Sequence, residues 1–219
     1  AGVGHHSHRD GDRRDAEVPR HQVAVRHPHA VAPREVGRCL VDVSVSWPHV
    51  GHGGEDHRVE TELVQLAGTR LAGCTGCLKC AEIRNNRCSG LKDDGLNECV
   101  AKMLAADGII IGSPTYYANC SAVTQALMER AGYATRKSGN PLARKVGAAV
   151  VAVRRGGAIH AFDSINHWFL INEMVVVGSS YWNIGIGREP GDVERDDEGV
   201  ATMRDLGSTM AWVLERLHG

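Results

Sequence analysis

Four of the seven cysteines stand close together, and their spacing is the strongest chemical signal in the sequence. Two consecutive C-x2-C steps are followed, after seven residues, by a fourth cysteine: Cys74, Cys77, Cys80 and Cys88. Such spacing brings thiolates round one centre and completes a four-thiolate shell. Consecutive C-x2-C steps favour an iron–sulfur cluster over zinc, whose usual pattern is two separated pairs. The interpretations are, in order of preference, a cubane four-iron four-sulfur cluster, packed or redox-active thiols without a metal, and a zinc ion.

A second group of polar residues directly follows a short run of three isoleucines, which is typical of a strand covered on both faces. In open parallel sheets, ligands bind in the crevice beyond the carboxyl ends of the strands. In the turn there, Ser113 and Thr115 offer hydroxyl groups, while Tyr116 or Tyr117 offers a flat apolar face to a planar ring. The alternative is a polar turn with one tyrosine packed in the core.

Two further turns follow later apolar runs. The first contains Arg154, Arg155, Gly156 and Gly157. Glycines let the backbone approach a ligand closely, and guanidinium groups favour a reduced, anionic ring or a phosphate. An ordinary solvent-exposed basic turn without a ligand is an equally good interpretation. The second turn, Gly178–Asn183, places a tyrosine and a tryptophan where they line the same crevice or cap the core.

The elements that must position these turns alternate along the chain from residue 58 onward. Apolar patterns predict strands at 59–66, 108–112, 146–153 and 174–177, and helices at 93–106, 121–134, 159–173 and 196–217. Asp93 is the expected cap of the first helix. Regular alternation of strand and helix predicts an α/β fold with a doubly wound parallel sheet, wrapped by helices on both faces.

Length and composition fit this interpretation. The chain has 219 residues, enough for one domain with a sizeable core, and its hydrophobic and charged fractions of 42% and 23% are those of a globular protein. A formal charge of -1 provides no field to attract nucleic acid or an anionic membrane. The longest apolar runs are shorter than the roughly 20 residues of a membrane-spanning helix. We expect a soluble, cytoplasmic protein without nucleic-acid or membrane partners.

Residues 1–57 differ in composition from the rest. They hold nine of the twelve histidines but no Lys, Ile, Phe, Tyr or Met, so they lack most residues that fill cores. Scattered histidines could bind metal, but no regular spacing supports a defined site. We expect an atypical, poorly ordered segment, or a wrong-frame translation of GC-rich coding sequence, that contributes little to the fold. The best candidate for order is 40–47, where valines alternate with polar residues.

The cysteine loop and the three turns, in this order, resemble the iron–sulfur flavoprotein branch of the NADPH-dependent FMN reductase and flavodoxin-like family over residues 58–219. The resemblance implies a five-stranded flavodoxin-like sheet, FMN at the strand ends, a 4Fe-4S cluster beside it, and homodimers or homotetramers. By position, it implies that the cluster ligands are Cys74, Cys77, Cys80 and Cys88. The residues that it implies for contact with FMN are Ser113, Pro114, Thr115, Tyr116, Tyr117, Asn119, Arg154, Arg155, Gly156 and Gly157.

One part of the family pattern is missing. The family begins with a strand, a Ser/Gly-rich loop that holds the FMN phosphate through backbone N–H groups, and a first helix. The sequence shows no such series before residue 59, although 41–55 imitates a strand and a loop. The predicted flavodoxin-like sheet therefore has a first strand and a phosphate loop that are missing or atypical. We expect the chain to bind FMN weakly and little better than riboflavin.

The expected function is that of a redox flavoprotein, which passes electrons between FMN and the cluster and is linked to NAD(P)H or ferredoxin as electron donor. One alternative is a cluster-free NAD(P)H-dependent FMN or quinone reductase. A non-catalytic four-cysteine zinc or interaction module is the other. No catalytic residue is assigned, because the sequence shows no convincing Ser-His-Asp set and no H-E-x-x-H motif. Cys99 and Cys120 are expected to pack in the core.

Overall fold

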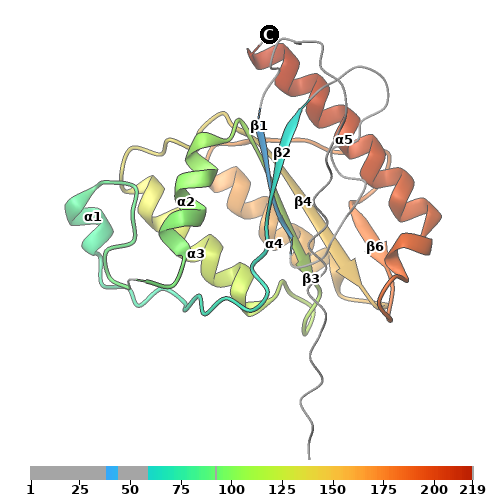
Figure 1. The fold of residues 1–219 in the computed structure, drawn as a ribbon, viewed down its shortest axis with the longest axis horizontal. Coiled ribbons are helices and arrows are strands. Elements are labelled where there is room, and N and C mark those ends of the chain that lie inside the picture. Colours follow the sequence, from blue (N-terminus) through green and yellow to red (C-terminus); the bar gives the residue numbers. More distant parts are fainter. Residues whose placement is uncertain (1–37, 44–58, 92, 219) are drawn as a thin grey trace, which may run out of the picture. The chain divides into compact units, whose positions relative to one another are not determined.

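The computed structural model describes residues 38–43, 59–91 and 93–218, which belong to one compact unit, Pro33–Gly219. Its centre is a parallel sheet with the strand order β2-β1-β3-β4-β5, in which β6 also pairs with β4 (Figure 1). The strands are β1 (Arg38–Val43), β2 (Glu60–Val64), β3 (Gly108–Pro114), β4 (Val146–Val153), β5 (Val175–Val176) and β6 (Ile184–Ile186). The predicted α/β fold with a doubly wound parallel sheet is confirmed.

Helices cover both faces of this sheet. The helices are α1 (Lys79–Ile83), α2 (Leu96–Ala105), α3 (Ala122–Arg136), α4 (Ala158–Ile171) and α5 (Asp197–His218), with a short 3-10 helix, η1, at Val193–Arg195. One apolar cluster joins Ile109 and Ile111 of β3 to α2, α3 and α4. A second cluster joins Ile110 of the same strand to α5 on the opposite side (Figure 1). Successive strand residues point to opposite faces, so this alternation explains why the isoleucine run is wholly apolar.

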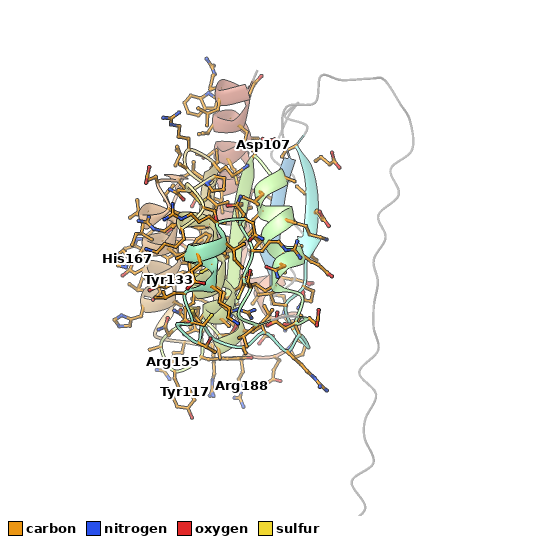
Figure 2. The ribbon with its side chains drawn as sticks, turned by 90° about the vertical axis from the view of Figure 1, so that its left-hand side faces the viewer. Asp107, Tyr117, Tyr133, Arg155, His167 and Arg188 are labelled. Carbon is orange, nitrogen blue, oxygen red and sulfur yellow. The ribbon has the colours of Figure 1, made fainter. Side chains whose placement is uncertain are left out.

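The strand pairs bring the carboxyl ends of β3 and β4 to one edge. Ser113 pairs with Val151 and Pro114 with Ala152 in a continuous parallel register. Figure 2 shows Tyr117, which follows β3, together with Arg155, which follows β4, at the same end of the molecule. Asp107, which precedes β3, lies at the opposite end (Figure 2). The predicted ligand-binding turns therefore share one edge of the sheet.

The prediction that the first strand is missing is wrong, because the chain forms β1. β1 pairs in parallel with β2 on one side and with β3 on the other, in the central position that the sequence left empty. It lies inside the first 57 residues and overlaps the segment 40–47 singled out as the best candidate for order. Its valine content and flanking partners outweigh the poor composition around it. The expected phosphate loop, with the rest of residues 1–57, lies outside the described residues.

Other elements differ from the predictions in detail. The fifth strand is divided: β5 pairs with the beginning of β4, and β6 with its end. Helix α1 and strand β6 are too short to give a periodic pattern in the sequence. Asp93 does not cap α2, because Gly95, with φ +84°, is the N-cap residue. Instead Asp94 accepts a hydrogen bond from Leu96 N–H at 3.4 Å.

In the part of the chain that the structure describes, the helices are all too short or too polar to span a bilayer.

Candidate functional site

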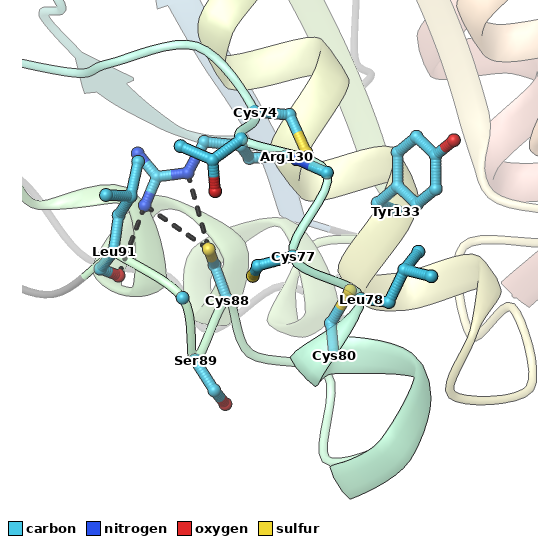
Figure 3. A pocket seen from close by; sticks show the side chains of 12 residues that line it. Cys74, Cys77, Leu78, Cys80, Cys88, Ser89, Leu91, Arg130 and Tyr133 are labelled. Atoms are coloured by element: carbon cyan, nitrogen blue, oxygen red, sulfur yellow. Dashed lines mark hydrogen bonds between the residues drawn. The ribbon is translucent and has the colours of Figure 1, made fainter.

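The four motif cysteines lie around a single pocket. The pocket is open to solvent. Figure 3 shows Cys74, Cys77, Cys80 and Cys88 around this space, with Tyr133 on one side and Arg130 on another. The full lining is Cys74, Thr75, Gly76, Cys77, Leu78, Cys80, Cys88, Ser89, Gly90, Leu91, Arg130 and Tyr133. The structure therefore brings together every cysteine that the sequence predicted to act together.

Glycines make the cysteine loop compact. Gly76 has φ +65°, a conformation that favours glycine, and it turns the chain between the first two cysteines. Gly90 stands against Cys77: a Cβ at position 90 would lie 2.3 Å from Cys77 Sγ. The sequence alone does not indicate this contact, because Gly90 belongs to the segment after Cys88 and meets Cys77 only in the folded loop.

Cys88 is the most firmly held of the four. The side chain of Asn97, on α2, accepts a hydrogen bond from Cys88 N–H at 2.8 Å and donates one to Cys88 C=O at 3.1 Å. From α3, Arg130 donates two hydrogen bonds to Cys88 Sγ, from Nε and from Nη2, each at 3.4 Å. Both the backbone and the sulfur of this residue are thus fixed before any ligand binds.

These contacts change the acid–base chemistry of Cys88. Burial disfavours the thiolate, but hydrogen bonds from the backbone of Leu91, from Arg130 and from the backbone of Gly90 outweigh burial and lower the pKa of Cys88. At Cys80 burial dominates and raises the pKa of the thiol. Metal ligands must be deprotonated, so these contacts favour the form of Cys88 that binds a cation.

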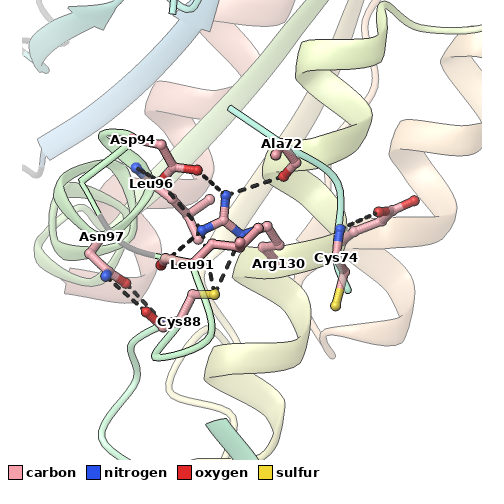
Figure 4. A network of polar contacts seen from close by, with 9 residues as sticks. Ala72, Cys74, Cys88, Leu91, Asp94, Leu96, Asn97 and Arg130 are labelled. Atoms are coloured by element: carbon pink, nitrogen blue, oxygen red, sulfur yellow. Dashed lines mark hydrogen bonds and ion pairs between the residues drawn. The ribbon is translucent and has the colours of Figure 1, made fainter. Parts of the chain in front are cut away.

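Arg130 is a functional candidate that the sequence analysis did not identify. Its side chain is only 1% exposed and forms a bidentate ion pair with Asp94 (Figure 4). It also donates to the carbonyl groups of Ala72, at 3.2 Å, and Leu91, at 3.3 Å. One signal for it exists in the sequence: Arg130 falls among Leu127, Ala131 and Ala134, on the buried face of α3.

Helix α3 contacts both candidate sites. At its beginning, Ser121 donates its backbone N–H to Ser113 Oγ, at 2.8 Å, and caps the helix by accepting from Thr124 N–H. Further along, the carboxylate of Glu129 accepts a hydrogen bond from Cys74 N–H at 3.2 Å. Arg130 then holds Cys88. One helix thus ties the turn after β3 to the cysteine pocket.

Within the described ranges, no group of three His, Cys, Asp or Glu side chains is arranged to hold a single metal ion. Four thiolates on one tetrahedral zinc would have to approach one another to about 3.8 Å, because Zn–S bonds are about 2.3 Å long. A cluster holds its ligands farther apart, since iron and sulfide atoms lie between them. The four free thiols supply the donor type that either group needs, and it is their C-x2-C-x2-C-x7-C spacing in the sequence that favours the cluster.

Two turns meet at the carboxyl edge of the sheet. A Cβ at position 157 would lie 2.9 Å from Ala118 Cα and 3.5 Å from Thr115 Cγ2, so the turn after β4 packs directly on the turn after β3. Gly157, with φ +87°, is also the N-cap residue of α4. Thr115 Oγ1 is buried and has no hydrogen-bond partner among the described residues. A buried hydroxyl without a partner is costly, and a polar group of a ligand at this edge would satisfy it.

The other predicted flavin residues divide into two groups. Ser113 and Asn119 serve the turn itself: Ser113 is fully buried and holds Ser121, while Asn119 pairs with Tyr116 and accepts from Cys120 N–H. Pro114 ends β3. The remaining residues are exposed and available to a ligand: Tyr116, Tyr117, Arg154, Arg155 and Gly156. Tyr181 and Trp182, whose ring centroids are 4.8 Å apart, are exposed in the turn after β5.

Comparisons with known proteins agree on family and fold. A model of the family described as NADPH-dependent FMN reductase matches residues 47–189. An iron–sulfur flavoprotein of Methanocaldococcus jannaschii is 39% identical over 191 residues, which cover 84% of this chain and 94% of that protein. An iron–sulfur flavoprotein of Methanosarcina thermophila is 35% identical over 73% of this chain and 81% of its own length.

A solved structure supports the same fold. The flavodoxin, WrbA-like protein from Agrobacterium tumefaciens superimposes with a TM-score of 0.53 at 19% identity. The match covers 84% of this chain and 99% of that one. The flavodoxin-like fold is therefore shared with a protein of distant sequence.

Proposed function

Because the chain belongs to the NADPH-dependent FMN reductase family, and within it to the iron–sulfur flavoproteins, we propose that it passes electrons between FMN and a four-iron four-sulfur cluster. As a member of this family it is a flavin-dependent oxidoreductase. The observation that carries the proposal is that Cys74, Cys77, Cys80 and Cys88 line one pocket. NAD(P)H or ferredoxin is the proposed electron donor.

The residues of the cysteine pocket fit a cluster. Four thiolates would each hold one iron, and a cluster supplies one-electron transfer when bound. Arg130 and the backbone of Gly90 and Leu91 stabilise the anionic sulfur of Cys88. Glu129 fixes the backbone at Cys74, and Asn97 fixes it at Cys88. These contacts orient two of the four ligands from helices that pack on the sheet.

The carboxyl edge of the sheet fits a flavin, which supplies hydride or single-electron chemistry when bound. Thr115 offers the buried hydroxyl without a partner among the described residues. Gly157 keeps the two turns in contact and allows the backbone to come close to a ring. Arg154 and Arg155 are exposed at the same edge, where their charge favours an anionic ring or a phosphate.

An absorption spectrum of protein purified without oxygen tests the proposal. Flavin bands with a broad additional shoulder in the blue, together with bound iron and sulfide, are the expected result. Flavin bands alone would indicate a cluster-free FMN or quinone reductase. Zinc with neither iron nor flavin would indicate a non-catalytic four-cysteine module. The last two outcomes would each refute the electron path between the two cofactors.

A Gly90→Ala variant is expected to bind clearly less iron than the wild type. The added methyl group would collide with Cys77 Sγ, so Cys77 must rotate and its sulfur leaves the position that it holds in the pocket. Iron and sulfide analysis of the purified variant measures this. Gly178→Ala is the matched control, because a Cβ there has nothing within 4 Å. Equal iron in both variants would show that the contact is unimportant.

The chain is expected to bind FMN and riboflavin with affinities within about tenfold of each other. A phosphate site of several charge-assisted hydrogen bonds, each worth roughly 1.5 to 3 kcal/mol, would separate the two ligands more than a thousandfold. The sequence of 41–57 lacks the expected Ser/Gly-rich loop and following helix. Titration by quenching of flavin fluorescence compares the two dissociation constants. Strong preference for FMN would show that the chain does provide a phosphate site, in residues 41–57 or at Arg154 and Arg155.

A further inference from the structure

The buried guanidinium of Arg130 is hydrogen-bonded to the sulfur of one of the four motif cysteines. Its side chain donates two hydrogen bonds to Cys88 Sγ, and both donor–acceptor distances are 3.4 Å. Water and salt screen the electrostatic interaction between charges at a protein surface. The side chain of Arg130, however, is only 1% exposed. Water therefore has little access to the guanidinium, and its charge is screened less from the sulfur than a surface charge would be.

The guanidinium is oriented by its other contacts. Asp94 accepts from Nη1 and Nη2 at the end of the fork, which leaves the side formed by Nε and Nη2 facing Cys88. The carbonyl group of Ala72 accepts from Nη1, and that of Leu91 accepts from Nη2, which shares its two N–H groups among Leu91, Asp94 and Cys88 (Figure 4). The five N–H groups of the planar arginine fork can reach all of these acceptors when one N–H is shared, whereas the three N–H groups of the lysine ammonium cannot.

We propose that Arg130 is a positioning residue that sets the reduction potential of the cluster through its two hydrogen bonds to Cys88 Sγ, with Asp94 as the opposing charge. The proposal rests on the proposed function, because it requires a cluster on the four cysteines. The reduced cluster carries one more negative charge than the oxidised cluster. Hydrogen bonds to the sulfur ligands and the local net charge are among the factors that set cluster potentials. Arg130 thus stabilises the reduced state, and Asp94 stabilises the oxidised state.

The two charges predict shifts of opposite sign. Removing Arg130 lowers the reduction potential, because the reduced state loses its donors and its positive neighbour. Neutralising Asp94 raises the potential, since Arg130 keeps its hydrogen bonds to Cys88, Ala72 and Leu91 while its charge is no longer balanced. A purely structural ion pair would give no reason for opposite signs, because either variant would loosen the same contact.

The test is a potentiometric titration of the cluster in the complete chain, followed by electron paramagnetic resonance of the reduced state. Arg130→Met should favour the oxidised state about tenfold, which is a shift of about 59 mV to more negative potential for one electron. Asp94→Asn should shift it in the opposite direction. Arg136→Met, at an exposed arginine on the same helix, is the matched control and should leave the potential unchanged.

Iron and sulfide content separates this proposal from the proposed function. A wild type without iron would refute the cluster itself, whereas wild-type iron with unchanged potentials in both variants would overturn only the role of Arg130. Shifts of the same sign in both variants would also overturn it. If Arg130→Met fails to fold, Arg130→Lys keeps the charge but loses the fork, and its potential must still fall below that of the wild type.

Discussion

A Cys77→Ala variant is expected to retain little or none of the iron and sulfide of the wild type. Each thiolate holds one iron of a four-iron cluster, so the loss of one ligand leaves an iron without its protein bond. Cys77 is exposed at the pocket, and its removal does not open a cavity in the core. The folded chain should therefore survive, and chemical analysis of iron and sulfide would report the loss of the cluster alone. Alanine at position 74, 80 or 88 should have the same effect.

Cys99→Ala is the control for this experiment. Cys99 lies on α2, packs partly buried against the apolar core and does not line the pocket. Its replacement should leave the iron content unchanged while lowering the thermal stability slightly. Full retention of iron and sulfide in Cys77→Ala would refute the assignment of the four ligands.

A Gly157→Ala variant is expected to bind flavin about ten- to a hundredfold more weakly. Two costs add at this position. Alanine at φ +87° is strained by roughly 1 to 3 kcal/mol, and its Cβ would lie 2.9 Å from Ala118 Cα, which is backbone and cannot rotate away. The turns after β3 and β4 must therefore separate, and Thr115 moves with them. A loss of about 1.4 kcal/mol corresponds to a tenfold change in affinity.

A glycine in the loop before β4 provides a matched control. Gly139 has φ +97°, so alanine is similarly strained there, but a Cβ has nothing within 4 Å. Gly139→Ala should bind flavin as the wild type does. Fluorescence titration gives the affinities, and thermal unfolding without flavin separates a weakened site from a weakened fold. Equal affinities for the two variants would contradict the importance of the contact between the turns.

The parts of this molecule that follow local patterns could be predicted from the sequence. The run of three isoleucines indicated a buried central strand, and the following helix was placed to within two residues at each end. The cysteine spacing predicted which four side chains share a pocket. In each case the relevant information lies within a short stretch of chain, where periodicity or spacing expresses it directly.

The parts that depend on distant partners could not be predicted. Arg130 reaches Cys88 and Asp94 across 42 and 36 positions of sequence. Gly90 matters only because the folded loop brings it against Cys77. Strand β1 is stabilised by two neighbouring strands, one of them the buried β3, and its own surroundings in the sequence give little indication of it. Tertiary context overrides local preference at such positions.

Helix α3 is held at two points, by Ser121 against the turn after β3 and by Arg130 against the cysteine pocket. These two contacts fix the number of residues between them. Ser121 is tied to the turn after β3, and Arg130 meets the cysteine pocket about two and a half helical turns later. Inserting or deleting one residue between them would rotate Arg130 by about 100° around the helix axis. Its charge would then leave the pocket while Ser121 stayed in place. Substitutions on the exposed side of this segment are tolerable, but changes in its length are not.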